Sequence, residues 1–511
     1  MGEVQIGGPT PLSAADVVAV ARHGVSAVVL HPDARDRMAS MRAHVEAKRD
    51  ADEVVYGITT GFGALATVHV PPADVRQLQH NLVRSHAAGA GEALPAEIVR
   101  AMMLLRARTL ATGHPGVRPA VAELLLSLLR AGITPAVPSR GSVGASGDLA
   151  PLAHIGLCVL GEGRVLADGG TEPAADAMGR AGIEPLALEA KEGLALVNGT
   201  EGMLALGLLA AHDAEQLLAI ADVTAAMSIE AALGTDRPFA ADLMALRPHP
   251  GQAASAANLR TLLAGSDITA SHLHSDHEVQ DPYSMRCAPQ VHGAARDALA
   301  FCREVFAREL ASVTDNPVVL EDGRVESAGN FHGEPLAYAL DLLAIAMTGA
   351  ANIAERRTAW LLAGGSTRGL PRFLTEHPGL SSGFMIAQYT QAALVSECKG
   401  LGHPASLDSI PTSGLQEDHV SMGWTAGLQL RAVLAHVATV FAIEGMCAAQ
   451  GLDLRAPLAP APGTRAARDA IRARVPHLDE DRDLSVDIAA TTTLVSSGEL
   501  LDAVREEVDL S

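Results

Sequence analysis

Long apolar stretches without proline dominate the second half of the chain. They span residues 203–233, 291–313, 336–363 and 420–450, with a shorter one at 385–399. Apolar residues occupy most faces of these stretches at helical spacing, and thirty residues at 1.5 Å each make a rod of roughly 45 Å. Such rods must bury their faces against one another. The pattern therefore predicts a bundle of long helices.

The first half of the chain has shorter apolar segments separated by loops. Residues 1–50 predict a short strand and two helices, with Ser13 as the cap of the first helix. Residues 95–109 repeat apolar positions in the manner of an amphipathic helix. We therefore expect a mainly α fold, with a smaller N-terminal domain over residues 1–200 and the helix bundle over residues 201–511.

Turn residues predict two hairpins and one linker. Residues 163–170 should turn at Asp168-Gly169, and the segment after Thr314 should turn at Asp322-Gly323. The proline-rich stretch 456–463 predicts a linker, after which two shorter helices end the chain.

Composition narrows the class of protein. The chain has 511 residues, of which 48% are apolar, and a net charge of −21. The charge argues against nucleic acid and anionic membranes as partners. Acidic residues interrupt the most apolar windows, which we therefore interpret as core helices and not membrane spans. Five widely spaced cysteines and no evident signal peptide favour a soluble protein of the reducing cytoplasm.

A glycine-spaced loop at residues 140–155 carries the most unusual chemistry. In Ala145-Ser146-Gly147 the Gly147 amide nitrogen can fold back on the Ala145 carbonyl carbon, because glycine lacks a Cβ. Loss of water would give an imidazolone, and loss of the Ser146 hydroxyl an exocyclic methylidene, which is an electrophile. A plain turn or an anion-binding loop is the alternative interpretation of this loop alone. Asp148 is expected to cap the following helix.

Three further loops contain candidate site residues. Tyr56 begins a glycine-rich loop, and His86 lies near a helix end; a simple turn and a surface histidine are the alternatives. Arg286 follows Gln280 and Tyr283 in a loop that enters a long helix. Its guanidinium could grip a carboxylate in bidentate fashion, or pair with surface acids.

Two other polar segments lie later in the chain. Phe331 is a scarce aromatic residue in a glycine loop. Residues 416–419 place polar side chains at the expected start of a long helix, where Asp418 would favour the helix dipole and Glu417 could serve a site. The cluster at residues 272–278 holds three histidines, but with 20 histidines in the chain such clusters arise by chance, and no metal site is expected.

Together these residues resemble those of the aromatic amino acid ammonia-lyases. The motif Gly-Ser-Val-Gly-Ala-Ser-Gly-Asp-Leu-Ala-Pro-Leu-Ala-His at residues 141–154 carries the resemblance, which covers nearly the whole chain. It implies the helical fold of the fumarase–aspartase superfamily and a homotetramer whose active sites draw on three chains. It also implies that residues 145–147 cyclise to 4-methylidene-imidazol-5-one, with no external cofactor.

The resemblance also implies roles for single residues. Tyr56 matches the catalytic base, which must act as a phenolate, so its pKa should be lowered. Ser146 supplies the electrophile that turns ammonia into a better leaving group. The other matches are a second tyrosine near the electrophile, two amides that hold the prosthetic group or substrate, and a carboxylate clamp: Tyr283, Asn198 and Gln280, and Arg286.

Substrate choice rests on the pocket residues. His86 and Glu417 resemble the forms selective for L-histidine, since a carboxylate can face an imidazole, whereas a phenyl ring would leave Glu417 without a partner. Met385, Phe331 and Gln416 are also matched to the substrate pocket. We therefore expect L-histidine to lose ammonia and give trans-urocanate, with a tyrosine or phenylalanine lyase or aminomutase as the alternative.

Two positions depart from the pattern of the family. Glu201 stands where glutamine is common, and Cys398 replaces a frequent asparagine. Both positions affect the expected choice of substrate, and neither affects the expected formation of the electrophile.

Overall fold

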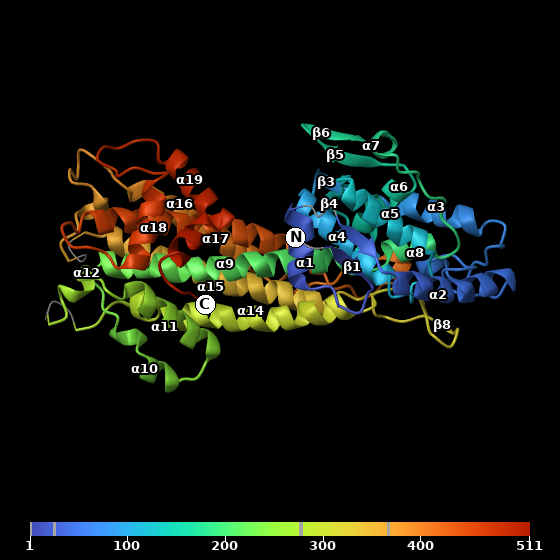
Figure 1. Ribbon diagram of the computed structural model, residues 1–511, viewed down its shortest axis with the longest axis horizontal. Coiled ribbons are helices and arrows are strands. Elements are labelled where there is room, and N and C mark those ends of the chain that lie inside the picture. The colour runs from blue at the N-terminus through green and yellow to red at the C-terminus, as the bar shows by residue number, and fades with distance from the viewer. Residues whose placement is uncertain (1–2, 24–26, 275–278, 365–367, 511) are drawn as a thin grey trace. The chain divides into compact units, whose positions relative to one another are not determined.

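Helices form most of the computed structural model, as Figure 1 shows. It describes residues 3–23, 27–274, 279–364 and 368–510. The predicted mainly α class is confirmed.

Five helices match the apolar stretches that the sequence singled out. They are α9 (Glu201–Ala231), α14 (Ala288–Ala311), α15 (Glu334–Leu362), α16 (Met385–Leu401) and α17 (Gly423–Asp453). By length and composition alone, α9, α15 and α17 could cross a membrane, so their acidic residues interrupt them less than expected. Most of each apolar window is nevertheless buried inside the protein.

Shorter helices make up most of the rest. They are α1 (Ala14–His23), α2 (Pro32–Asp50), α3 (Val75–His86), α4 (Ala96–Leu110), α5 (Pro119–Arg130), α6 (Leu149–Val159), α7 (Ala174–Ala181), α8 (Glu192–Val197), α10 (Ala241–Ala245), α11 (Pro250–Leu263), α12 (Asp267–Ala270), α13 (Tyr283–Arg286), α18 (Pro462–Arg472), α19 (Leu484–Ser497) and α20 (Glu499–Arg505). Ser13 caps α1 as predicted, because its Oγ accepts the Asp16 amide at 3.1 Å. The chain closes with three short helices, α18 to α20, where two were expected.

Strands occur in short pairs. Strand β1 (Val4–Ile6) pairs in parallel with β2 (Val28–Leu30), and the antiparallel pairs are β3 (Ala90–Ala93) with β4 (Pro138–Arg140), β5 (Arg164–Ala167) with β6 (Gly170–Pro173), and β7 (Val318–Val319) with β8 (Val325–Glu326). The last two pairs are the predicted hairpins. The β3–β4 pair brings the chain that follows α3, and thus His86, beside the start of the glycine loop.

The structure divides into two compact units. The first contains residues 1–209, 303–340 and 405–428, and the second contains residues 210–302, 341–404 and 429–511. This division differs from the expected boundary at residue 200, because two later segments join the N-terminal unit. The segments contain Phe331 and Glu417, so these residues share a unit with Ser146.

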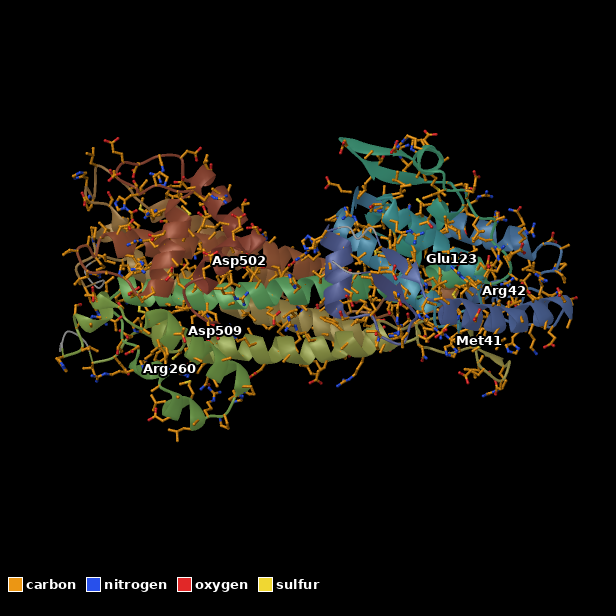
Figure 2. All side chains as sticks on the ribbon, in the orientation of Figure 1. Met41, Arg42, Glu123, Arg260, Asp502 and Asp509 are labelled. Carbon is orange, nitrogen blue, oxygen red and sulfur yellow. The ribbon has the colours of Figure 1, made fainter. Side chains whose placement is uncertain are left out.

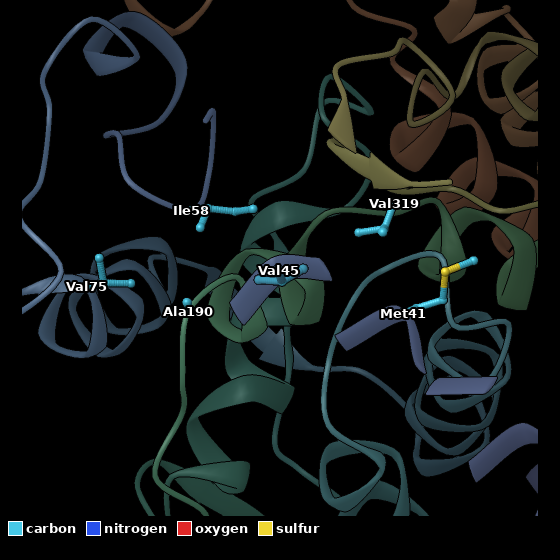
Figure 3. Close-up of a cluster of buried hydrophobic side chains, with 6 residues drawn as sticks. All are labelled: Met41, Val45, Ile58, Val75, Ala190 and Val319. Carbon is cyan, nitrogen blue, oxygen red and sulfur yellow. The ribbon is translucent and has the colours of Figure 1, made fainter. Parts of the chain in front are cut away.

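A hydrophobic cluster in the first unit holds the Tyr56 loop in place. Figure 3 shows Ile58 of that loop among the buried side chains of this cluster, Met41, Val45, Val75, Ala190 and Val319. Burial of each large apolar side chain contributes roughly 1.5–3 kcal/mol. Arg42, labelled on α2 in Figure 2, is also buried and donates to the Ala190 carbonyl at 2.6 Å. The loop that carries Tyr56 is therefore anchored in the hydrophobic core of the first unit.

A buried polar network organises the second unit. Asp222 accepts hydrogen bonds from His292 at 2.8 Å and from Arg296 at 2.7 Å. Arg357 pairs with Glu444 at 2.5 Å and donates to the Ser284 carbonyl at 3.3 Å. Because Ser284 lies in α13, this network fixes the short helix that carries Tyr283 and Arg286.

Candidate active site

The glycine loop turns back on itself at Ser146. It connects β4 to α6, and Ala145 and Gly147 lie opposite each other as bridge partners across Ser146. Gly147 has φ +69°, a left-handed conformation that favours glycine. Ala145 is buried and Ser146 is half-buried. This geometry fits the cyclisation that the sequence predicts, because it places the two bond-forming residues face to face.

Gly147 and Gly199 make a close backbone contact. They are bridge partners, and the Asp148 amide donates to the Gly199 carbonyl at 2.8 Å. A Cβ on Gly147 would lie 2.1 Å from the Gly199 oxygen, which no real contact allows. Helices α6 and α9 each begin two residues after these glycines, so their positive ends lie close to the loop.

Asp148 stabilises a different helix from the one expected. It occupies the N-cap position of α6, but its side chain makes no capping bond there. Its carboxylate instead accepts the Ser142 hydroxyl at 3.0 Å and the Met203 amide, in the first turn of α9, at 2.9 Å. Complete burial raises the pKa of Asp148 to about 7, although both hydrogen bonds lower it. Asp148 therefore joins the loop to α9.

A segment from late in the chain holds the other side of the loop. Ser421 Oγ donates to the Gly144 carbonyl at 3.1 Å, and the Met422 amide donates to Val143 at 2.9 Å. The buried Trp424 indole donates to the Ser139 carbonyl at 2.9 Å. Sequence reasoning missed these contacts, for which the only signal is the run Ser-Met-Gly-Trp that follows the Glu417 segment.

Asn198 presents a buried acceptor without a partner. Its Nδ2 donates to the Asn316 carbonyl at 2.8 Å, whereas its Oδ1 is buried and finds no donor among the described residues. An unsatisfied buried carbonyl of this kind is costly unless a bound group pairs with it. This orphaned acceptor suits an N–H donor of a bound substrate. The Gly147 turn, which brings Gly147 opposite Ala145, is the feature that fits a ring formed at residues 145–147.

Glu201 belongs to the protein interior. It is buried and pairs with Arg106 at 2.9 Å, and it accepts the Thr109 hydroxyl at 2.8 Å. The departure at this position is therefore compensated by a buried cation.

Tyr56 lies in a setting that opposes its ionisation. Its hydroxyl oxygen accepts the Gly63 amide at 3.2 Å, which lowers the pKa of Tyr56. Burial has the larger effect and raises that pKa, and the charges on Glu417 and Asp315 raise it further. The expectation of a lowered pKa is wrong for this arrangement, because burial and two carboxylates outweigh one amide.

His86 and Glu417 form a pair of complementary groups. His86 Nδ1 lies 2.9 Å from the Leu82 carbonyl and must donate to it, so Nε2 is left as an acceptor. Burial lowers the pKa of His86, although the Glu417 charge raises it. Glu417 Oε2 is buried and has no hydrogen-bond partner among the described residues. Both free atoms are acceptors, so the pair can receive a group that carries two N–H donors, such as a protonated imidazole.

The Glu417 segment is a loop and not a helix start. Glu417 pairs with Thr412 across a tight bend, and α17 begins only at Gly423. The interpretation of Asp418 as a helix-dipole residue is therefore wrong. Gln416 is exposed in this loop.

The Phe331 loop is tied to the Glu417 loop. His332 Nε2 donates to the His419 carbonyl at 3.2 Å, and the two imidazole rings stack with centroids 5.8 Å apart. With Glu334 they form a group of metal-ligand type whose atoms lie within 4.8 Å. His332 Nδ1, however, already accepts the Glu334 amide at 3.3 Å, and its Nε2 donates to His419, so both ring nitrogens of His332 are engaged in hydrogen bonds.

The remaining predicted residues lie in the second unit. Tyr283 and Arg286 share α13, where the guanidinium carbon lies 4.5 Å from the centre of the tyrosine ring. Arg286 Nε is buried without a partner among the described residues, which suits a ligand carboxylate. Gln280 is exposed just before α13, and Met385 begins α16. All the other predicted site residues lie in the first unit.

The histidine cluster of the sequence is described only in part. His272 has its ring nitrogens 2.9 Å from the Ile268 carbonyl and 3.1 Å from the Gly234 carbonyl. His277 and Glu278 lie outside the described residues.

Comparison with known proteins decides the family. The family profile described as "Aromatic amino acid lyase" matches residues 12–473. The chain belongs to the aromatic amino acid lyases. A histidine ammonia-lyase from Anaeromyxobacter sp. (strain K) is 54% identical over 486 residues, which are 93% of this chain and 96% of that protein.

Solved structures of this family share the fold of the present lyase. Tyrosine aminomutase from Streptomyces globisporus matches with a TM-score of 0.95 and 38% identity, over all of both chains. Histidine ammonia-lyase from Trypanosoma cruzi matches with a TM-score of 0.90 and 40% identity, over 99% of this chain and 96% of that one. The expected fumarase–aspartase-like helical fold of the lyase is confirmed.

Proposed function

We propose that this aromatic amino acid lyase removes ammonia from L-histidine without oxidation and releases trans-urocanate. The structural observation that supports L-histidine as the substrate is the unpaired carboxylate oxygen of Glu417, close to His86. The histidine ammonia-lyases that are more than half identical to the chain support the same reaction.

The imidazole ring is the part of the substrate that the first unit recognises. His86 Nε2 accepts an imidazole N–H, and the Glu417 carboxylate pairs with the ring on a second side. A charge-assisted hydrogen bond of this kind contributes about 1.5–3 kcal/mol. A phenol would leave one of the two groups without a partner, and a phenyl ring would leave both.

The prosthetic group comes from the chain itself. Residues 145–147 would provide 4-methylidene-imidazol-5-one, and Asn198 Oδ1 would accept a hydrogen bond from the bound substrate. When present, this group supplies the electrophile that makes the substrate amine a better leaving group. No external cofactor is part of the proposal.

Tyr56 is the proposed base for the β-proton of the substrate. The Gly63 amide stabilises its phenolate by a hydrogen bond. Because burial, Glu417 and Asp315 raise the pKa of Tyr56, the substrate ammonium would supply the positive charge that favours the phenolate.

The second unit supplies the rest of the proposed machinery. Arg286 binds the substrate carboxylate, Tyr283 lies near the electrophile, and Gln280 holds the substrate or the ring. Met385, with Phe331 and Gln416 of the first unit, lines the pocket. A homotetramer in the cytoplasm, with active sites built from three chains, completes the proposal.

An assay with substrates of three ring types tests the function. Purified protein should convert L-histidine to urocanate, followed by the absorbance of the conjugated product, and should act slowly on L-tyrosine and L-phenylalanine. Conversion of L-tyrosine to its β-isomer, in preference to histidine turnover, would identify an aminomutase and overturn the assignment.

The electrophile has a separate test. The peptide that contains residues 145–147 should be two waters lighter than its sequence mass, whereas Ser146→Ala should fold and assemble but keep the full mass and lose nearly all activity. An unmodified mass in the native protein would contradict every lyase mechanism based on this loop.

A further inference from the structure

A fully buried ion pair lies behind the segment that contacts the cyclising loop. Arg106, on α4, and Glu201, in the first turn of α9, are 0% and 2% exposed. Replacing such a pair by apolar side chains is often neutral for stability, so burial alone does not explain why charged groups stand here. The geometry of the guanidinium gives a more specific reason.

Arg106 uses one nitrogen for three contacts. Nη1 donates to Glu201 Oε1 at 2.9 Å, to Oε2 at 3.0 Å and to the Asn198 carbonyl at 3.0 Å. The usual fork-to-fork pairing would use two nitrogens. Nε and Nη2 are buried and have no acceptor among the described residues. The guanidinium thus forgoes its best pairing geometry while it bonds to the Asn198 backbone.

The carboxylate is itself fixed by neutral groups. The Thr109 hydroxyl donates to Glu201 Oε1 at 2.8 Å, and the Thr314 hydroxyl lies 3.4 Å from the same atom. Because these two hydroxyls fix the Glu201 carboxylate, Glu201 can hold Arg106 in position.

Gly199 transmits this position to the loop. A Cβ on Gly199 would lie 2.1 Å from Arg106 Nη1 and 2.2 Å from Glu201 Oε2. The Gly199 carbonyl in turn accepts the Asp148 amide and would collide with any side chain on Gly147. One glycine therefore separates the ion pair from Gly147.

We propose that Arg106 is a positioning residue for ring formation. It holds the Asn198-Gly199 backbone as the surface against which Gly147 turns towards Ala145, and Glu201 neutralises its charge. This inference rests on the proposed function only in requiring that the ring forms.

The reaction that depends on this placement balances without a co-reactant. A bond forms between the Gly147 nitrogen and the Ala145 carbonyl carbon. The Ala145 oxygen leaves as water with the amide hydrogens of Gly147 and Ser146. The Ser146 hydroxyl leaves as a second water with the Ser146 Cα hydrogen. Only the approach of the nitrogen to the carbon requires a fixed backbone.

Two variants disturb the same ion pair but differ at Asn198. Glu201→Gln keeps Arg106 and its bond to the Asn198 carbonyl, whereas Arg106→Met removes that bond. Mass spectrometry of the peptide that contains residues 145–147 gives the fraction of chains with the ring. We expect this fraction to stay within twofold of native in Glu201→Gln and to fall at least tenfold in Arg106→Met. Equal fractions in the two variants would overturn the proposal.

Kinetics and a double variant separate positioning from stability. In Arg106→Met, kcat should fall in proportion to the ring fraction while KM stays unchanged, because chains with a ring have an intact pocket. Arg106→Met combined with Glu201→Leu removes both charges and should regain thermal stability without regaining the ring. Recovery of the ring with stability would show that Arg106 acts only through folding. An unmodified native protein would instead refute the proposed function.

Discussion

Glu417 is the residue on which substrate recognition depends most directly. Its buried, unpaired oxygen has no role in the hydrogen bonding of the described residues. Glu417→Gln should lower kcat/KM for L-histidine by roughly 30-fold, since loss of a charge-assisted hydrogen bond costs about 2 kcal/mol. Steady-state assays measure this effect. Asp418→Asn, at an exposed neighbour, is the matched control and should leave kcat/KM unchanged; an equal loss in both variants would contradict the assigned role.

Asp148 links protonation to stability. Because the pKa of Asp148 is about 7 in the folded protein and near 4 in an unfolded chain, the folded state binds the proton more tightly. Its contribution is present at acidic pH and is lost as pH rises from about 4 to about 7, by an amount on the order of 4 kcal/mol. Urea unfolding of native protein and of Asp148→Asn across that range measures it. The difference in free energy of unfolding between the two proteins should change with pH. A constant difference would count against the raised pKa of Asp148.

Single residues were predictable where chemistry is local. The cyclising tripeptide and the Ser13 cap depend on neighbours in sequence, and the structure has the predicted cap and a loop that suits the ring. The pKa of Tyr56 was not predictable, because it depends first on burial in the folded chain and then on Glu417 and Asp315, which lie far away in the sequence. Arg106 was missed for the same reason, since one of three arginines in α4 gives no sign in the sequence of the backbone that it holds.

At the scale of elements, two helix starts meet through glycines. Gly199→Ala should destabilise the protein by several kcal/mol and lower the ring fraction, because its Cβ has no room between Arg106 and Glu201. Thermal unfolding and peptide mass measure the two effects. Gly179→Ala, within α7 and with nothing within 4 Å of the added Cβ, is the control and should be neutral or slightly stabilising. A fully cyclised, stable Gly199→Ala protein would argue against a tight contact.

The sequence pattern was enough to locate most of the long helices and the hairpins, but not every helix boundary. Apolar periodicity located the five helices α9 and α14 to α17, and Asp-Gly turns located two hairpins. The start of α17 was misplaced because residues 416–419 are as polar as a helix start. The local Thr412–Glu417 bend and the tertiary contact of Ser421 with Gly144 delay the helix to Gly423.

At the scale of the whole molecule, the chain returns to its first unit twice. Residues 303–340 and 405–428 bring Phe331 and Glu417 to the unit of Ser146, whereas Tyr283 and Arg286 belong to the other unit. Such a division could not be read from composition, which changes only once along the chain.

The proposed assembly has a direct test. The protein should elute as a particle of about 211 kDa, four times the 52.7 kDa chain, as measured by light scattering. Co-expression of Ser146→Ala with Tyr283→Phe should restore part of the activity that each lacks alone, if an active site takes these residues from different chains. Failure of mixed tetramers to regain activity would place both residues in one chain.

The buried indole of Trp424 gives the protein an internal fluorophore. The chain has only two tryptophans, and Trp424 bonds to Ser139 at the entry of the cyclising loop and lies against Gly202 at the start of α9. In a Trp360→Phe protein, emission would come from this one position. Time-resolved fluorescence could then follow maturation of the loop in the folding chain, without substrate and without a label.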